Sequence, residues 1–253
     1  MTIWQTALFL LCVALASCAQ SLSGFAFSLI LLGLAGLLEL APLADLANVA
    51  NVLALANAQV ALRRSGKTLD VPAFRDMSMG GLAGIVTGVL LLDWLGSSVI
   101  LGLRLLLGLT VVACAIIVLL DSAALRQRSS AAAFRLWGAL SGLLTGLFST
   151  GGPPLVYHLY RQPMEPRTVR DTLVATLAAS SLVRLLVVLS TGQFGLNALK
   201  MCLLAVPLVF ALSWWMERHP PGWSRPAMLK LICFLLLLTG GGLIVPALLQ
   251  IAR

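Results

Sequence analysis

The stretch Ser149-Thr150-Gly151-Gly152-Pro153-Pro154 interrupts a segment that is otherwise apolar enough to cross a lipid bilayer. Glycine weakens a helix through its backbone entropy, and proline lacks the N–H group and clashes with the preceding turn. In hydrocarbon such a break is tolerated only where protein or a water-filled cavity surrounds the freed backbone groups. Secondary transporters place substrate sites at such breaks, with half-helix N-termini pointing at anionic groups. The stretch therefore predicts a helix broken at membrane depth and a permease for a small solute.

The composition is typical of a polytopic membrane protein. Of 253 residues, 60% are hydrophobic and 10% are charged, and the mean hydropathy is +1.01, whereas a soluble domain carries about 25% charged residues. The net charge of +8 comes mostly from Lys and Arg in short gaps between apolar runs, where cytoplasmic loops carry them. Because the sequence has no basic stripe interleaved with aromatic residues, we expect the lipid bilayer and not nucleic acid as its partner.

Apolar runs of about 20 residues, the length of a transmembrane helix, recur along the whole chain. The first and the fifth are too long for one simple crossing, and the fifth contains the glycine–proline break. We therefore predict an all-α polytopic membrane protein with about eight transmembrane helices, some of them broken or re-entrant. The runs cover residues 3–40, 43–62, 76–95, 98–121, 132–161, 167–190, 196–215 and 227–250.

The order of features recurs in the two halves of the chain. Segment 22–28 resembles segment 144–150, at an offset of 122 residues, and each lies late in a long first run. Each is followed by a run that ends in a glycine turn and then by two further runs. Such weak internal symmetry is expected of transporter folds, and the alternative is a chance likeness among Leu-, Gly- and Ser-rich segments. The predicted organisation is a first four-helix repeat over 1–121, a basic cytoplasmic linker over 122–131 and a second four-helix repeat over 132–253.

The crossing count decides the sidedness. If each long run crosses once, both termini lie on the same side, and the slight excess of Lys and Arg in the gaps on that side predicts cytoplasmic termini in a cell membrane. The repeats are then parallel. If segments 24–41 and 150–165 are re-entrant hairpins, each half crosses an odd number of times and the repeats are inverted.

The sequence indicates no metal site, cofactor or enzymatic activity. The five cysteines lie inside apolar runs without C-x-x-C spacing, and two histidines are too few for a zinc enzyme. Segment 61–68 nearly matches a phosphate-binding loop but follows an apolar helix instead of a buried strand, so we expect secondary transport without ATP. The alternative functions are a membrane scaffold or assembly protein and an intramembrane enzyme.

Polar side chains inside the runs add three candidates. Arg184, at membrane depth, either meets an anionic substrate through its fork of donors or extends to the membrane surface. Asn51, one turn from Asn48, either lines the pathway or joins helices by hydrogen bonds. His158, four residues after Pro154, is a candidate proton relay because imidazole titrates near neutral pH, and the alternative is an anchor for its helix.

Two motifs resemble those of a known family. Segment 144–154 resembles the glycine- and proline-rich signature in the second half of the sulfite exporter (TauE/SafE-like) permeases, and segment 20–27 resembles the first-half signature of one branch. With the duplicated eight-run plan, the resemblance spans nearly the whole chain. It implies export or uptake of small sulfur-containing or organic anions across a plasma membrane. This chain departs from the family at Phe27-Ser28-Leu29-Ile30, where many members carry a G-x-G-G-G cluster.

The predicted site is a pocket between the two repeats. Backbone N–H groups near the two breaks suit an anion through the partial positive charge of helix N-termini, and hydroxyl groups add further donors. The predicted function is secondary transport of a small anion such as sulfite or a sulfonate, with homo-oligomerisation left open. The predicted substrate-binding residues are Ser23, Gly24, Asn51, Thr145, Gly146, Ser149, Thr150, Gly151, Gly152 and Arg184.

Overall fold

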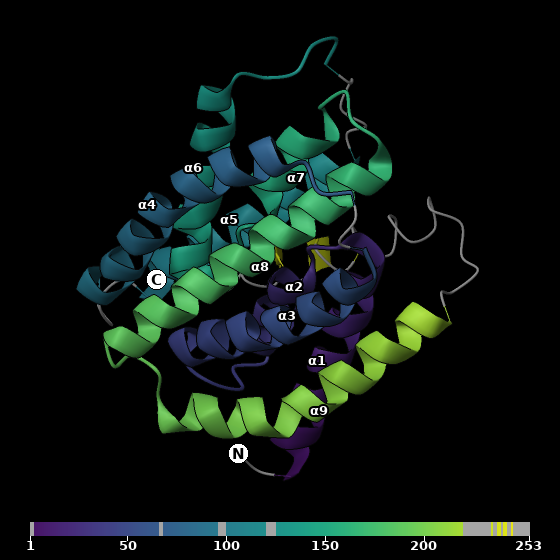
Figure 1. The fold of residues 1–253 in the computed structure, drawn as a ribbon. Helices are drawn as coiled ribbons and strands as arrows, with labels where there is room; N and C mark the ends of the chain where they lie inside the picture. The colour runs from purple at the N-terminus through teal and green to yellow at the C-terminus, as the bar shows by residue number, and fades with distance from the viewer. Residues whose placement is uncertain are drawn as a thin grey trace.

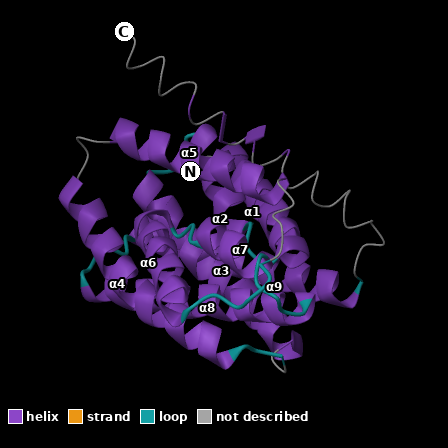
Figure 2. Cartoon of the chain, turned by 90° about the horizontal axis from the view of Figure 1, so that it is seen from above, coloured by secondary structure: helices purple, strands orange, loops and turns teal. Residues whose placement is uncertain are grey.

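The computed structural model describes residues 3–65, 68–95, 100–119 and 125–219, with positions 234, 237, 238, 240, 241 and 244. Within these residues every secondary-structure element is a helix, and short loops join the helices (Figure 2). The elements are α1 (Ile3–Ser23), α2 (Phe27–Leu37), α3 (Leu43–Ser65), α4 (Val71–Leu95), α5 (Ile100–Leu119), α6 (Ala131–Phe148), α7 (Gly152–Tyr160), α8 (Pro166–Ser190) and α9 (Leu196–Arg218).

The predicted all-α membrane fold is confirmed at this level. Five of the described helices are long and apolar enough to cross a membrane by length and composition; they are α1, α4, α6, α8 and α9. Most of the last predicted run, 227–250, and residues 122–124 of the predicted linker lie outside the described residues. The count of eight crossings and the internal repeat therefore stay predictions.

Each of the two long apolar runs folds into a helical hairpin. In the first, α1 runs to a tip at Gly24 and α2 returns, so that Leu40 lines the same cavity as Thr6 near the start of α1. In the second, α6 runs to a tip at Ser149 and α7 returns, so that the N–H of Leu125, before α6, donates to the carbonyl of Arg161, after α7, at 2.7 Å. The break predicted at 149–154 is thus a reversal of the chain direction. The re-entrant alternative of the sequence analysis stays a prediction.

The two hairpins enter the helix bundle from opposite ends. Asp45, in the first turn of α3, lines the cavity at the base of the first hairpin. After α3, Thr68 donates its hydroxyl to Asp171 at 2.6 Å, and the N–H of Asp70 donates to Thr172 at 3.1 Å. Both partners lie at the start of α8, just after the second hairpin. Since α3 carries the chain from one base to the other, the hairpins point toward each other.

Helices α4 and α6 lie side by side and run in the same direction on one flank (Figure 1). Glycines recur every four residues on both, the small-xxx-small pattern that lets helix backbones approach closely in membranes. A Cβ atom at Gly84 would lie 2.2 Å from the carbonyl oxygen of Ala139, and one at Gly142 would lie 2.2 Å from that of Gly81. The repeating glycines are Gly80, Gly84 and Gly88 on α4 and Gly138, Gly142 and Gly146 on α6.

On the opposite flank, α1 packs beside α9 (Figure 1). The hydroxyls of Ser17 and Ser213 lie 3.4 Å apart, and Asn57 on α3 donates to the Ser17 hydroxyl at 3.1 Å. Helix α2 is buried on most of its surface, with Phe27 and residues 29–32 fully inaccessible to solvent. A helix that is apolar all round belongs in the interior of a bundle, and α2 there supports the first tip.

Candidate functional site

The tips of the two hairpins meet inside the bundle. A Cβ atom at Gly152, in the second tip, would lie 3.0 Å from the ring of Phe25 in the first. Between the tips and the neighbouring helices lies a cavity of about 30 Å³. The lining comes from both tips and from α1, α3 and α8: Gln20, Gly24, Phe25, Ser28, Ala54, Ala58, Ser149, Thr150, Gly151, Gly152, Val174, Leu177, Ala178 and Ser181.

The first tip is built from a glycine and a local cap. Gly24 has φ of +85°, a conformation that glycine adopts without steric cost. The hydroxyl of Ser23 accepts hydrogen bonds from the N–H groups of Phe25 at 3.3 Å and Ala26 at 3.2 Å. It donates to the carbonyl of Ala19 at 2.8 Å. The Ser23 side chain therefore provides hydrogen-bond partners for the backbone between the end of α1 and the start of α2.

The second tip is held mainly by contacts within α6 and with α3. Ser149 has φ of +58° and ends α6, with its N–H donating to the carbonyl of Thr145 at 2.7 Å. Its hydroxyl donates to Oδ1 of Asn51 on α3 at 3.0 Å. The hydroxyl of Ser141 donates to the carbonyl of Gly151 at 2.7 Å. Among the buried side-chain polar atoms of this tip, one hydroxyl has no hydrogen-bond partner.

That exception is Thr150. Its side chain is 2% exposed and lines the cavity, and its Oγ1 atom is buried without a hydrogen-bond partner. A buried polar atom without a partner costs about 1–3 kcal/mol. The Thr150 hydroxyl is therefore a donor available in the wall of a cavity between two broken helices.

Both returning helices begin at the cavity. At the start of α2, the N–H of Ile30 donates to the carbonyl of Ala26. The N–H groups before Ile30 belong to the first turn of the helix and have no intrahelical acceptor. In α7 the first turn reads Gly152-Pro153-Pro154, and prolines have no N–H to offer. Helix α2 therefore presents more backbone donors than α7, whose side of the cavity depends on Thr150 and Gly152.

The predicted residues divide into those that line the cavity and those that support it. The lining includes Gly24, Ser149, Thr150, Gly151 and Gly152. The supporting residues are Ser23, Asn51, Thr145, Gly146 and Arg184, none of which belongs to that lining.

Asn51 and Arg184 tie α3, α6 and α8 together behind the cavity. Besides accepting from Ser149, Asn51 donates to the carbonyl of Ser181 on α8 at 2.9 Å. Arg184 is 1% exposed, and its guanidinium donates to the carbonyl of Gly146 at 3.2 Å and to Oδ1 of Asn48 at 3.0 Å. Arg184 therefore stays in the interior instead of extending to the surface. Its role as a direct substrate ligand stays a prediction.

Three polar lining residues were missed by the sequence analysis. Ser28 lies in the first turn of α2, Gln20 lies one turn before Gly24, and Ser181 faces the cavity from α8. The first two have a signal in the sequence, because each is within one turn of a break. Ser181 has none, since its place depends on how α8 packs against the tips.

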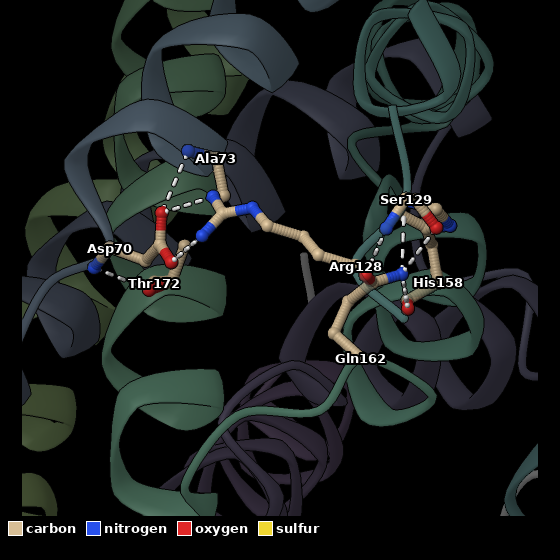
Figure 3. Close-up of polar contacts among 7 residues, drawn as sticks. All are labelled: Asp70, Ala73, Arg128, Ser129, His158, Gln162 and Thr172. Atoms are coloured by element: carbon tan, nitrogen blue, oxygen red, sulfur yellow. Dashed lines mark hydrogen bonds and ion pairs between the residues drawn. The ribbon is translucent and has the colours of Figure 1, made fainter. Parts of the chain in front are cut away.

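A polar cluster fastens the base of the second hairpin to the start of α4 (Figure 3). Arg128 holds both carboxylate oxygens of Asp70, at 2.9 and 2.7 Å, and the N–H of Ala73 donates to the same carboxylate at 2.9 Å. Burial alone raises the pKa of Asp70. The hydrogen bonds from Arg128 and Ala73 and the charge of Arg128 outweigh burial, so the pKa of Asp70 lies below its ordinary value.

The neighbouring residue Ser129 closes the other side of this cluster. Its N–H donates to Oε1 of Gln162 at 3.0 Å, and Nε2 of Gln162 donates to the Ser129 hydroxyl at 2.9 Å and to the carbonyl of His158 at 3.2 Å (Figure 3). The His158 ring packs edge-on against Phe134 and stacks on Trp137. His158 thus lies apart from the cavity lining, and its proton-relay role stays a prediction.

Comparison with known proteins places the chain in a family. The family model described as sulfite exporter TauE/SafE matches residues 9–243. A curated relative from Cupriavidus necator, named as a probable sulfite/organosulfonate exporter TauE, is 35% identical over 229 residues, which cover 90% of this chain and 89% of the relative. No solved structure matches this chain significantly. Both the resemblance noted in the motifs and the transporter assignment are confirmed: the chain belongs to the sulfite exporter TauE/SafE family of membrane transporters, and not to an enzyme class.

Proposed function

We propose that this transporter moves small sulfur-containing or organic anions, such as sulfite or a sulfonate, through the cavity between the hairpin tips. The observation that carries the proposal is the unpaired hydroxyl of Thr150, buried in the wall of that cavity. An anion oxygen would accept a hydrogen bond from it and remove the cost of leaving it unpaired. The name of the relative, a probable sulfite/organosulfonate exporter, supports the choice of substrate class.

The backbone at the tips supports binding of a negative charge. The N-termini of α2 and α7 begin at the cavity from opposite sides, and helix N-termini carry a partial positive charge and free N–H groups. Ser28 and Gln20 add side-chain polarity near α2. The proposed substrate-binding residues are the lining members Gly24, Ser149, Thr150, Gly151 and Gly152, with Ser23, Thr145, Gly146, Asn51 and Arg184 behind them.

The small volume of the cavity indicates how the transporter works. About 30 Å³ accommodates about one water molecule, so an anion with several oxygens requires the tips to separate. We propose that relative movement of the two hairpins opens the cavity alternately to the two sides of the membrane, as in other transporters with discontinuous helices. Since no ATP-binding motif is present in the sequence, ion or substrate gradients would drive this movement.

The hairpins also support an arrangement of inverted repeats. If both hairpins are re-entrant, α1 and α6 do not cross in spite of their length and apolar composition. The proposed crossings are then α3, α4 and α5 in the first half and α8, α9 and the run 227–250 in the second. The two halves then contain their helices in the same order but with opposite orientations in the membrane. Such inverted repeats are typical of transporters. The proposed repeats keep their bounds, 1–121 and 132–253, with the basic linker 122–131 between them.

A single crossing per apolar run predicted cytoplasmic termini. The distribution of charge between the two ends of the bundle favours the opposite orientation. The end that holds the base of the second hairpin carries most of the arginines, whereas Lys200 lies at the other end. By the positive-inside rule the arginine-rich end is cytoplasmic, so we propose termini on the outer side of the cell membrane. The arginines at that end are Arg63, Arg75, Arg126, Arg128, Arg135, Arg161, Arg167, Arg170 and Arg218.

Replacement of Thr150 by valine tests the proposed site. Thr150→Val keeps the shape of the side chain and removes only the hydroxyl, which has no partner in the structure. We expect the melting temperature of the purified protein to stay the same or rise. The KM for sulfite or a sulfonate in proteoliposomes should rise about 10- to 100-fold, because a hydrogen bond to a charged group contributes about 1.5–3 kcal/mol.

Thr176→Val is the matched control. Thr176 is equally buried, but its hydroxyl donates to the carbonyl of Thr172 at 2.7 Å within α8, and the residue lies outside the cavity lining. Its flux should equal that of the parent. Parent-like KM values in Thr150→Val would remove the cavity as the substrate site, and a parent protein without any anion flux would refute the transport proposal itself.

A further inference from the structure

A hairpin tip poses an electrostatic problem for an anion site. The returning helix presents a positive N-terminus, but the entering helix ends at the same place with a C-terminus that carries about half a negative charge. The two ends therefore cancel over a short distance. The cavity is bordered by two such pairs, the end of α1 with the start of α2 and the end of α6 with the start of α7.

Two arginines of α8 donate hydrogen bonds to these two C-terminal ends. Arg184 Nε donates to the carbonyl of Gly146 at 3.2 Å, and Arg170 Nη2 donates to the carbonyl of Ser21 at 3.4 Å. Gly146 is the third residue from the end of α6, and Ser21 is the third residue from the end of α1. Carbonyls at that position lie in the last turn, where a helix has acceptors without intrahelical donors.

We infer that Arg170 and Arg184 neutralise the C-terminal ends of α1 and α6 and so leave the N-termini of α2 and α7 to set a positive potential in the cavity. The inference rests on the proposed function, since it concerns the same site. The arginines act as positioning residues: each works through a helix end, and neither belongs to the cavity lining.

The surroundings of Arg184 support this role. Its other hydrogen-bond acceptor is Oδ1 of Asn48, a neutral amide, at 3.0 Å. Neither of these two acceptors carries a negative charge that would compensate the charge of the guanidinium. In the low dielectric of a buried site this charge acts over a longer distance than it would in water.

Arg170 extends the same argument to the first hairpin. Its Cγ atom lies 3.8 Å from the position that a Cβ atom would take at Gly24, so the side chain passes directly beside the tip. Arg170 is half-buried and four residues into α8. One helix, α8, thus supplies a cation to each hairpin.

Charge can be separated from hydrogen bonding by paired substitutions at Arg170. Arg170→Lys keeps the charge, and Arg170→Gln keeps a donor and removes the charge. We expect the glutamine variant to raise the KM for anion flux about 2- to 30-fold with the maximal rate retained, since a cation at a helix C-terminus contributes about 0.3–2 kcal/mol. The lysine variant should keep a KM close to that of the parent.

Arg184→Gln provides a second test in the interior, where a lysine would readily lose its proton. It should raise KM at least as much as Arg170→Gln, because burial strengthens the effect of its charge. The exposed Arg167, one turn from Arg170 on α8, is the control, and Arg167→Gln should behave as the parent. If Arg184→Gln does not fold, the Arg170 pair still decides the question.

Equal KM values for Arg170→Lys and Arg170→Gln would overturn the inference, because packing or hydrogen bonding would then explain the role of the residue. A loss of maximal rate without a change in KM would overturn it as well. Absence of flux in the parent protein would instead refute the proposed function, so the two failures are distinguishable.

Discussion

The two hairpin tips reach the same reversal of direction by different means. The first tip uses a glycine with φ of +85° and a serine that caps the backbone within its own turn. The second places a serine, Ser149, at φ of +58° and holds it through Asn51 on another helix. A non-glycine residue in this region costs about 1–2 kcal/mol. The turn of the first tip is therefore capped by its own side chain, whereas the second tip adds a side-chain hydrogen bond to another helix.

The bases of the hairpins differ as well. Arg128 binds Asp70 at the start of α4, and Ser129 and Gln162 join the two ends of the second hairpin (Figure 3). The base of the first borders an open cavity of about 320 Å³, lined by Asp45 and Lys200 among others. The base of the first hairpin therefore borders a cavity, and the base of the second is held by an ion pair and hydrogen bonds.

The strongest test of the difference between the tips is alanine at a glycine of each. In the second tip, a Cβ atom at Gly151 would lie 2.1 Å from Oγ1 of Thr145 and 2.8 Å from the carbonyl of Ser141. Because a backbone carbonyl cannot move aside, we expect Gly151→Ala to destabilise the protein by about 3 kcal/mol or more and to abolish flux. Thermal unfolding in detergent and flux in proteoliposomes measure both effects.

Gly24→Ala is the matched substitution in the first tip. Its Cβ atom would approach Val174 no closer than 3.4 Å, so the cost is the positive φ alone, about 1–2 kcal/mol. The protein should fold and retain part of its transport rate. Equal losses at the two positions would contradict the view that the second tip is the more tightly packed.

The second prediction concerns Asn51, the residue on which the second tip depends. Asn51→Leu leaves the buried hydroxyl of Ser149 without its acceptor, at a cost of about 1–3 kcal/mol, and removes the side-chain hydrogen bond from α3 to the carbonyl of Ser181. We expect a destabilisation of about 2–3 kcal/mol and a lower transport rate.

The corresponding change in the first tip is Ser23→Ala, which removes a cap and should cost about 1 kcal/mol. Thermal unfolding of the two variants measures the comparison. If Ser23→Ala proves as costly as Asn51→Leu, the first tip also depends on more than its own turn.

The local sequence predicts a break in each half of the chain, but it does not show which residues of the two breaks are structurally equivalent. The glycine–proline stretch and Gly24 were sufficient to predict interrupted helices at membrane depth, and the hairpin alternative followed from the length of the runs. The local match pairs Gly24 with Gly146, which lies inside α6 against α4, whereas the residues with positive φ that end α1 and α6 are Gly24 and Ser149. Ser149 ends α6 through hydrogen bonds within its own helix, and Asn51 on α3 accepts from its hydroxyl; the contact with the distant helix leaves no local pattern in the sequence.

Contacts between distant helices also explain why some predicted site residues line the cavity and others only support it. Ser149, Thr150, Gly151 and Gly152 reach the cavity because the break itself faces it. For Arg184, burial was one alternative from the sequence, but its acceptors depend on the crossing of α6 and α8. By contrast, the glycines spaced four apart on α4 and α6 are a readable signal for helix contact, and the sequence analysis did not use it.

The smallest predicted effect lies at the base of the second hairpin. Asp70→Asn keeps the cap on Ala73, because asparagine also caps helix N-termini well, and removes the charge that Arg128 binds. A partly exposed ion pair contributes about 0.2–1 kcal/mol, and Arg128 is 45% exposed. Near neutral pH, the variant should therefore melt only a few degrees below the parent.

The pH dependence identifies the cause of this loss. Since the folded protein holds the pKa of Asp70 below its ordinary value, the ion pair stabilises the protein above the pKa of an unfolded aspartate, about 3.9. That contribution disappears as the pH falls through the lower pKa of the folded state. The melting curves of parent and Asp70→Asn should therefore converge as the pH falls through the folded-state pKa of Asp70 and separate as the pH rises above it. A gap of constant size across this range would show that the carboxylate contributes through hydrogen-bond geometry alone, and the base of the second hairpin would then owe its closure to Ser129 and Gln162 instead of to charge.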